Sequence, residues 1–140
     1  MDRLKRFRRL ARAERALLLQ AALAIVAVRF ALRFLSFERV RALACRAAGS
    51  ATCPLSSQCI VWAIEAASRQ LPSSSCLTKA LAAQALLNRH GYASQLMIGV
   101  ARNEAWGFEA HAWITCQNQV LIGGPETERY APLLNLGVRS

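Results

Sequence analysis

The helix patterns of this chain all precede its strand patterns. Helical spacing or helix boundaries mark residues 8–35 (as one or two helices), 37–47, 56–70 and 76–90. Strand patterns then mark residues 92–100, 109–116 and 119–122, with a loop over 102–108 and a hairpin turn at Gln117-Asn118. This order is typical of an α+β fold, in which an N-terminal helical region precedes an antiparallel sheet.

Two of these helices have features that place their ends and faces. In the last helix, Ser75 is a plausible N-cap, Cys76 falls in the first turn, and Gly91 after Arg89-His90 is a stop signal with two cations in the last turn. In the helix over 56–70, the spacing predicts a stripe made of Cys59, Trp62, Ala63 and Ala66.

Positive charge is concentrated in the first third of the chain. The 140 residues suffice for one domain, which we expect to consist of a basic helical region at 1–48 and a core at 49–140. Residues 1–46 hold twelve Lys and Arg against three Asp and Glu, whereas the remaining residues are almost balanced. Since Arg29 and Arg33 lie among apolar residues and no nucleic-acid fold signature follows, we do not expect nucleic-acid binding.

The apolar run after the basic start, residues 16–28, leaves two readings open. It resembles a signal sequence, but no cleavage site follows and the helical pattern continues through Arg33. We expect helices that pack on the core, and the alternative is a helix that lies in a membrane interface. The predicted location is the cytoplasm, with peripheral membrane association as that alternative.

Five cysteines form no regular framework. An odd number argues against a disulfide scaffold and fits a reducing cytoplasm, and the spacing of Cys53 and Cys59 is not that of a zinc knuckle. We expect no metal and no cofactor, since a phosphate-binding loop is also missing from the sequence. We expect Cys45, Cys59 and Cys116 to be buried structural residues.

Cys76 and His111 are the residues that suggest chemistry. A cysteine at a helix N-terminus is favoured as the thiolate, and His111 lies in a predicted strand that follows. A thiol and an imidazole that meet can carry out acyl transfer through a cysteine nucleophile. The oxyanion would be bound by the backbone N–H of Cys76, or by Gln58 in the manner of papain-like sites.

The segments around these two residues resemble a known superfamily. Residues 76–92 are similar to the cysteine helix of transglutaminase-like proteins, and residues 97–100 with 108–114 are similar to their histidine strand. Within that superfamily the chain resembles the leader peptidases of lasso-peptide biosynthesis, and its basic, alanine-rich start does so as well. The resemblance implies a transglutaminase-like or papain-like core in which Cys76 is the nucleophile and His111 the base.

The resemblance also implies a substrate and partners. The substrate is a ribosomally made precursor peptide, cut where its leader joins the core peptide, and a separate lasso cyclase then closes the ring. Residues 1–70 do not have the pattern of a fused leader-recognition domain, so the resemblance implies the stand-alone form that uses a separate leader-binding protein. Two other readings are another acyl-transfer enzyme of the same superfamily and a non-catalytic interaction or membrane-associated protein.

One position departs from the superfamily pattern. An Asp is expected shortly after the histidine, but the only Asp in this chain is Asp2. Glu126, Asn118 or a backbone carbonyl remains to orient the imidazole. If the strand continues past Pro125, hairpin geometry favours Glu126 as the third catalytic residue.

Overall fold

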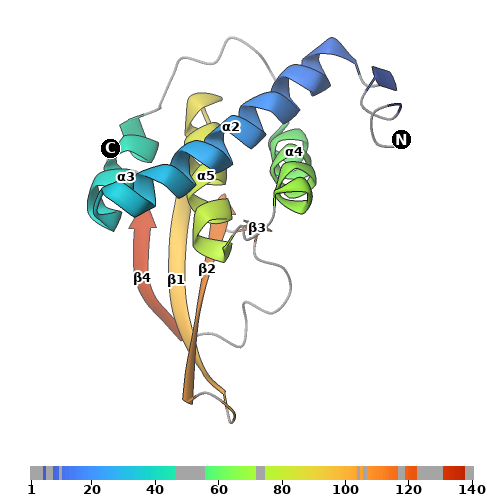
Figure 1. Ribbon diagram of the computed structural model, residues 1–140. Coiled ribbons are helices and arrows are strands. Elements are labelled where there is room, and N and C mark those ends of the chain that lie inside the picture. Colours follow the sequence, from blue (N-terminus) through green and yellow to red (C-terminus); the bar gives the residue numbers. More distant parts are fainter. Residues whose placement is uncertain are drawn as a thin grey trace.

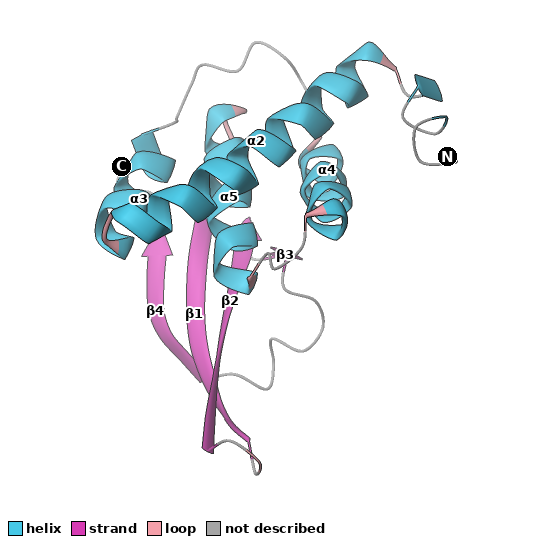
Figure 2. Cartoon of the chain, in the orientation of Figure 1, coloured by secondary structure: helices cyan, strands magenta, loops and turns pink. Residues whose placement is uncertain are grey.

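The computed structural model describes residues 5, 8, 9, 11–46, 56–71, 75–103, 105, 107–116, 119–122 and 131–137. Its helices are α2 (Arg12–Phe34), α3 (Phe37–Arg46), α4 (Ser57–Gln70) and α5 (Cys76–Arg89), and its strands are β1 (Ser94–Asn103), β2 (Gly107–Cys116), β3 (Gln119–Ile122) and β4 (Ala131–Gly137), as Figure 1 shows. The helices gather at one end of the molecule and the strands extend away from them (Figure 2). The predicted α+β order is therefore confirmed.

The sheet is antiparallel and has the strand order β3-β2-β1-β4. Its centre is a long hairpin, in which β1 and β2 pair over their whole length with Gly99 opposite His111. The first four residues of β2 are exposed, whereas most of its second half is buried. Only the half of the hairpin nearest the helices therefore contributes to the core.

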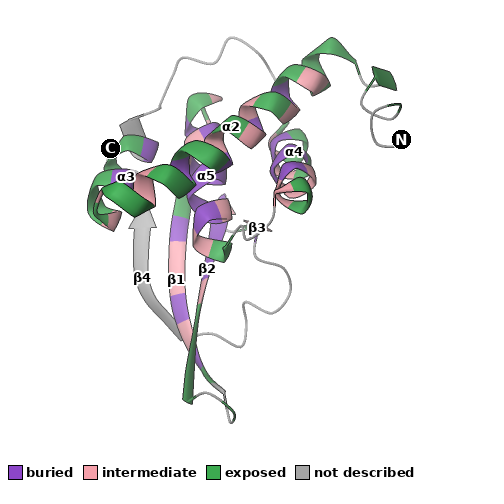
Figure 3. Cartoon of the chain, in the orientation of Figure 1, coloured by how far each residue is buried: buried purple, intermediate pink, exposed green. Residues whose placement is uncertain are grey.

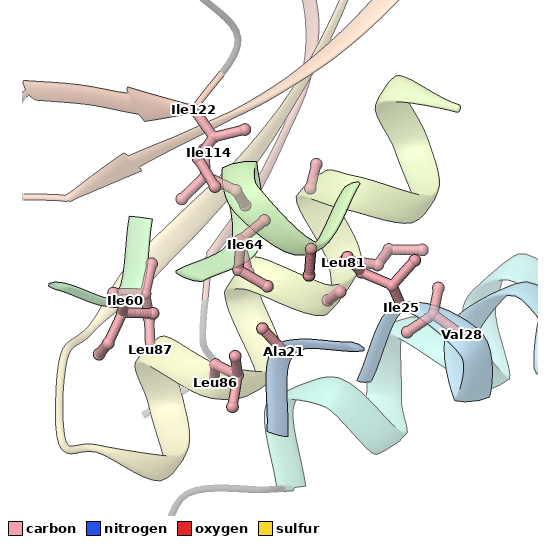
Figure 4. Close-up of a cluster of buried hydrophobic side chains, with 14 of the residues drawn as sticks. Ala21, Ile25, Val28, Ile60, Ile64, Leu81, Leu86, Leu87, Ile114 and Ile122 are labelled. Carbon is pink, nitrogen blue, oxygen red and sulfur yellow. The ribbon is translucent and has the colours of Figure 1, made fainter. Parts of the chain in front are cut away.

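α5 is the central helix of the fold. It contacts α2, α3 and α4 as well as β1 and β2. Nine of its fourteen residues are buried, including the run Ala80, Leu81, Ala82 and Ala83. A helix that is apolar nearly all round must be enclosed, and its alanines let the neighbouring elements approach closely. The enclosing side chains are shown in Figure 4.

The buried face of α4 differs from the predicted one. The buried residues are Ile60, Ala63, Ile64 and Ala67, so the predicted stripe is wrong at three of its four positions and right at Ala63. Contacts with α2 and α5 select the face that carries the two isoleucines. Cys59 is consequently exposed, which corrects its assignment as a buried structural residue.

The strands begin and end at positions set by the sheet as a whole. β1 begins at Ser94, not at residue 92, because the backbone N–H of Tyr92 closes the end of α5 by donating to Leu87. The expected loop over 102–108 is short, since the hairpin extends through Asn103 on one side and from Gly107 on the other. Extended pairing of two long strands overrides weak local strand propensity here.

β4 was not predicted from the sequence. Its residues Ala131–Gly137 include Pro132 and have little strand propensity, yet they pair with β1 at the edge of the sheet. A register irregularity between Ile98 and Gly99 accompanies Pro132, which cannot donate a hydrogen bond to the ladder. Residues 131–137 therefore form a strand because they pair with the free edge of the long strand β1.

The basic helical region and the core share one hydrophobic cluster. Leu17, Ala21, Ile25 and Val28 of α2 pack in the same cluster as α4, α5 and the sheet. Figure 4 shows Ile25 of α2 beside Leu81 of α5. The boundary predicted at residue 48 lies outside the described residues and stays a prediction.

Candidate active site

Cys76 is the first residue of α5, and its thiol is exposed. Ser75 precedes it as the N-cap, and the Ser75 hydroxyl accepts a hydrogen bond of 3.2 Å from the backbone N–H of Thr78. The Ser75 and Thr78 hydroxyls also lie 2.9 Å apart. The predicted cap is confirmed, and it holds the thiol at the positive end of the helix dipole.

An ion pair links the first turn of α5 to α4. The ammonium of Lys79 lies 3.0 Å from a carboxylate oxygen of Glu65, and both side chains are partly buried. Because the two charges come from different helices, the pair restrains the orientation of the α5 N-terminus against α4. Sequence reasoning missed this pair, since a separation of fourteen residues has no local signature.

His111 lies in the middle of β2 and is partly buried. Its ring stacks on that of Trp113, with 6.1 Å between the ring centroids and 22° between the planes. Trp113 packs in turn with Ala101 and Met97. Side chains alternate along a strand, so His111 and Trp113 share one face of the sheet.

α5 packs on the other face of β2. Ala112 and Ile114, which alternate with His111 and Trp113, belong to the main core together with the residues of α5. The structure therefore brings the two elements that carry Cys76 and His111 into contact. It does not place their side chains on the same face of the sheet.

Neither candidate for orienting the imidazole falls within the described residues. This holds for both Asn118 and Glu126. The described pairing between β2 and β3 extends from Cys116 to Ile114. The proposed orienting roles of Asn118 and Glu126 stay predictions.

A cavity of about 310 Å³ opens between the start of α4 and α2. It is lined by Glu14, Leu17, Gln58, Cys59 and Trp62. Gln58 and Cys59 lie at the start of α4, whereas the chain passes to Cys76 from the other end of that helix. Gln58 is thus remote in the fold from the thiol, and the backbone N–H groups at the start of α5 are the better placed oxyanion donors.

Cys116 is buried, as predicted, and is suited to a structural role. Its thiol donates to the backbone oxygen of Ala93 over 3.3 Å, and burial raises the pKa of the Cys116 thiol. The described parts of the chain contain no group of three or more His, Cys, Asp or Glu that could hold a metal ion.

His90 ends α5 at a distance from Cys76. The backbone N–H of Gly91 donates to Asn88 and that of Tyr92 to Leu87, while Gly91 adopts a φ of 84°, as in a Schellman motif. Fourteen residues of helix, roughly 21 Å, separate His90 from the thiol, so His90 cannot act as its base. Burial and then the charge of Arg89 lower the pKa of His90, which disfavours the cation that the sequence predicts at the end of α5.

This lowered pKa makes His90 a source of acid sensitivity. Its Nε2 is buried without a hydrogen-bond partner among the described residues, so protonation is disfavoured in the folded state. Stability is complete above the unfolded pKa of about 6.5 and is lost as the pH falls through the folded pKa. We expect Tm to fall less in a His90→Asn variant than in wild type between about pH 8 and about pH 5. An equal fall in Tm for the variant and the wild type, measured by thermal denaturation scans, would contradict this assignment.

The sequence that forms these elements matches the model of a known protein family. Residues 16–135 match the family model described as the transglutaminase-like superfamily. The chain belongs to the transglutaminase-like superfamily. No curated protein and no solved structure matches it. Transglutaminase-like proteins are usually enzymes, and membership supports acyl-transfer chemistry of the cysteine protease or transglutaminase kind.

Proposed function

We propose that this chain is a cysteine peptidase that removes the leader from a lasso-peptide precursor. The observation that supports it most is the exposed Cys76 thiol in the capped first turn of the central helix of a transglutaminase-like fold. The resemblance of the chain, including its basic, alanine-rich start, to lasso leader peptidases supports the choice of substrate.

In the proposed reaction the sulfur of Cys76 attacks the carbonyl carbon at the junction of leader and core. His111 takes the thiol proton and then delivers it to the nitrogen of the departing core peptide as the C–N bond breaks. Water attacks the thioester that remains, releasing the leader as a carboxylic acid and regenerating the thiol. Backbone N–H groups at the start of α5 stabilise the oxyanion in both steps.

The proposed roles of His111 and Glu126 require the imidazole to approach the Cys76 thiol and the carboxylate to approach the imidazole. α5 packs on the face of β2 opposite to His111, so the proposed role requires the imidazole to move within about 3 Å of the thiol to accept its proton. Stacking on Trp113 limits the orientations of the His111 ring, and the proposed carboxylate of Glu126 would supply the orienting contact for which superfamily members use Asp. Whether His111 meets Cys76 in solution can be measured without knowing the substrate.

We expect His111→Ala to slow the alkylation of Cys76 by iodoacetamide roughly tenfold at neutral pH, because an adjacent imidazole raises the reactive thiolate fraction. Site-resolved mass spectrometry follows the modification with time. Cys59 is an internal control, since it is exposed in the first turn of a different helix and its rate should not change. Equal rates of Cys76 alkylation in the variant and the wild type would show that His111 does not act as the base.

We propose that the peptidase works in the cytoplasm with a separate leader-binding protein and a lasso cyclase. Positioning of a long, flexible precursor supplies much of the rate of such a reaction. The decisive assay mixes the chain with the leader-binding protein and a precursor encoded beside its gene. Mass spectrometry that finds separate leader and core supports the proposal.

Two other products of the same assay identify the alternatives. Cross-linked precursor, with loss of ammonia and no cleavage, would indicate a transglutaminase. Unchanged precursor, together with a Cys76 thiol that resists alkylation, would indicate a non-catalytic interaction or membrane-associated protein.

A further inference from the structure

α2 has two apolar faces, and only one of them is covered. Leu17, Ala21, Ile25 and Val28 form the face that packs in the core. An outer stripe lies almost opposite to it and consists of Leu19, Leu23, Val26, Phe30 and Phe34. Leu23 is 69% exposed and Phe34 is 77% exposed, so these side chains face solvent. Figure 3 shows exposed residues along much of α2.

The outer stripe is continuous and has cations at both ends. It runs over sixteen residues of helix, roughly 22 Å, without an acidic residue. Arg12 lies in line with Leu23 three turns earlier, and Arg33 adjoins Phe34 at the other end; both are exposed. Long arginine side chains can lie along apolar surface while the guanidinium groups stay in water.

The acidic residues nearest to the stripe do not offset this charge. Glu14 accepts a hydrogen bond of 3.1 Å from the backbone N–H of Ala11 at the start of α2. Glu38 pairs with Arg41 over 3.2 Å. Residues 1–46 as a whole carry nine more Lys and Arg than Asp and Glu. The surface around the stripe is therefore both apolar and positively charged.

We propose that the outer stripe of α2 binds the surface of an anionic membrane, with the helix lying in the plane of the interface. The leucines and phenylalanines enter the boundary between headgroups and acyl chains, and arginines contact lipid phosphates. A partner protein is less well matched, because the stripe lacks the Trp and Tyr anchors that are common at the centre of protein interfaces. This inference is independent of the proposed peptidase activity.

The core contacts of α2 favour a surface position over a membrane span. Among the described helices α2 is the one long and apolar enough to cross a membrane by length and composition. A span would, however, remove Leu17, Ala21, Ile25 and Val28 from the core they share with α4 and α5. A helix in the interface keeps these contacts and uses the outer stripe alone.

The test is flotation of the purified full chain with two kinds of vesicle at low salt. One kind is pure phosphatidylcholine and the other has three parts phosphatidylcholine to one part phosphatidylglycerol. We expect flotation with the anionic vesicles only, and release by alkaline carbonate. Binding to neither kind, or retention after carbonate as for a spanning helix, would overturn the proposal.

Variants assign the binding to the stripe. Leu23→Ser with Phe30→Ser should weaken vesicle binding at least tenfold, and Arg12→Gln with Arg33→Gln should weaken it about twentyfold at low salt. Phe108→Ser is the matched control, because Phe108 is 76% exposed but lies on β2, outside the stripe. This variant should bind vesicles as the wild type does. Circular dichroism verifies folding of each variant.

Two results would reassign the stripe. Unchanged vesicle binding by the Leu23/Phe30 double variant would show that another surface binds lipid. A wild-type dimer in sedimentation that the same variant abolishes, without vesicle binding, would assign the stripe to a second copy of the chain.

Discussion

Replacing Cys76 by Ala is expected to abolish precursor cleavage, with a loss of at least three orders of magnitude in rate. Without the sulfur no thioester can form, and the remaining backbone donors give only a small background rate. The variant should fold normally, because the thiol is exposed and the cap depends on Ser75 and Thr78 instead. Rates are measured by mass spectrometry of the released leader, with the leader-binding protein present.

Two other cysteines provide matched controls for this experiment. Cys59→Ala should keep wild-type activity, since Cys59 is also exposed but lies in the first turn of a different helix. Cys116→Ser should keep it too, because the serine hydroxyl can still donate to the backbone oxygen of Ala93. Cys76 would not be the nucleophile if the folded Cys76→Ala variant still cleaved the precursor. The same would follow if only Cys59→Ala abolished cleavage.

Replacing Leu81 by Ala is expected to lower the free energy of unfolding by about 2–5 kcal/mol. Leu81 is completely buried in α5 and lies beside Ile25 of α2, so the shorter side chain leaves a cavity between two helices (Figure 4). A loss of this size is a large part of the total stability of a domain of this length. Urea denaturation, monitored by circular dichroism, measures the change in the free energy of unfolding.

Leu23→Ala is the matched control, since it makes the same change at a position that is 69% exposed. In the absence of membranes it should alter the free energy of unfolding by less than about 0.5 kcal/mol. If Leu81→Ala and Leu23→Ala lowered the free energy of unfolding by the same amount, α2 would not be packed on α5 as the structure shows.

Local signals in the sequence sufficed to predict α5 and the architecture. The serine before Cys76, the alanine-rich run and the glycine at position 91 place both ends of the helix within a residue of their observed positions. Capping and a left-handed glycine act over one turn, so a single sequence contains all they require. The same holds for the succession of helices and strands, which predicted the α+β class.

Other features were decided by contacts between distant segments. The face of α4 that is buried depends on α2 and α5; it differs by one position from the predicted stripe and leaves Cys59 exposed. β4 exists because β1 offers an edge, in spite of Pro132. The lowered pKa of His90 depends on its burial, which the helix pattern alone does not reveal.

The candidate site shows the same division. The sequence by itself determined that Cys76 opens a helix and that His111 lies in a strand, because both depend on short-range patterns. Which face of the sheet turns toward α5 was decided by the register of β2 against β1 and by the packing of Ala112 and Ile114 on the helix. Side chains alternate with a period of two, so that choice assigns every residue of β2 to one side or the other, and only the assembled core makes it.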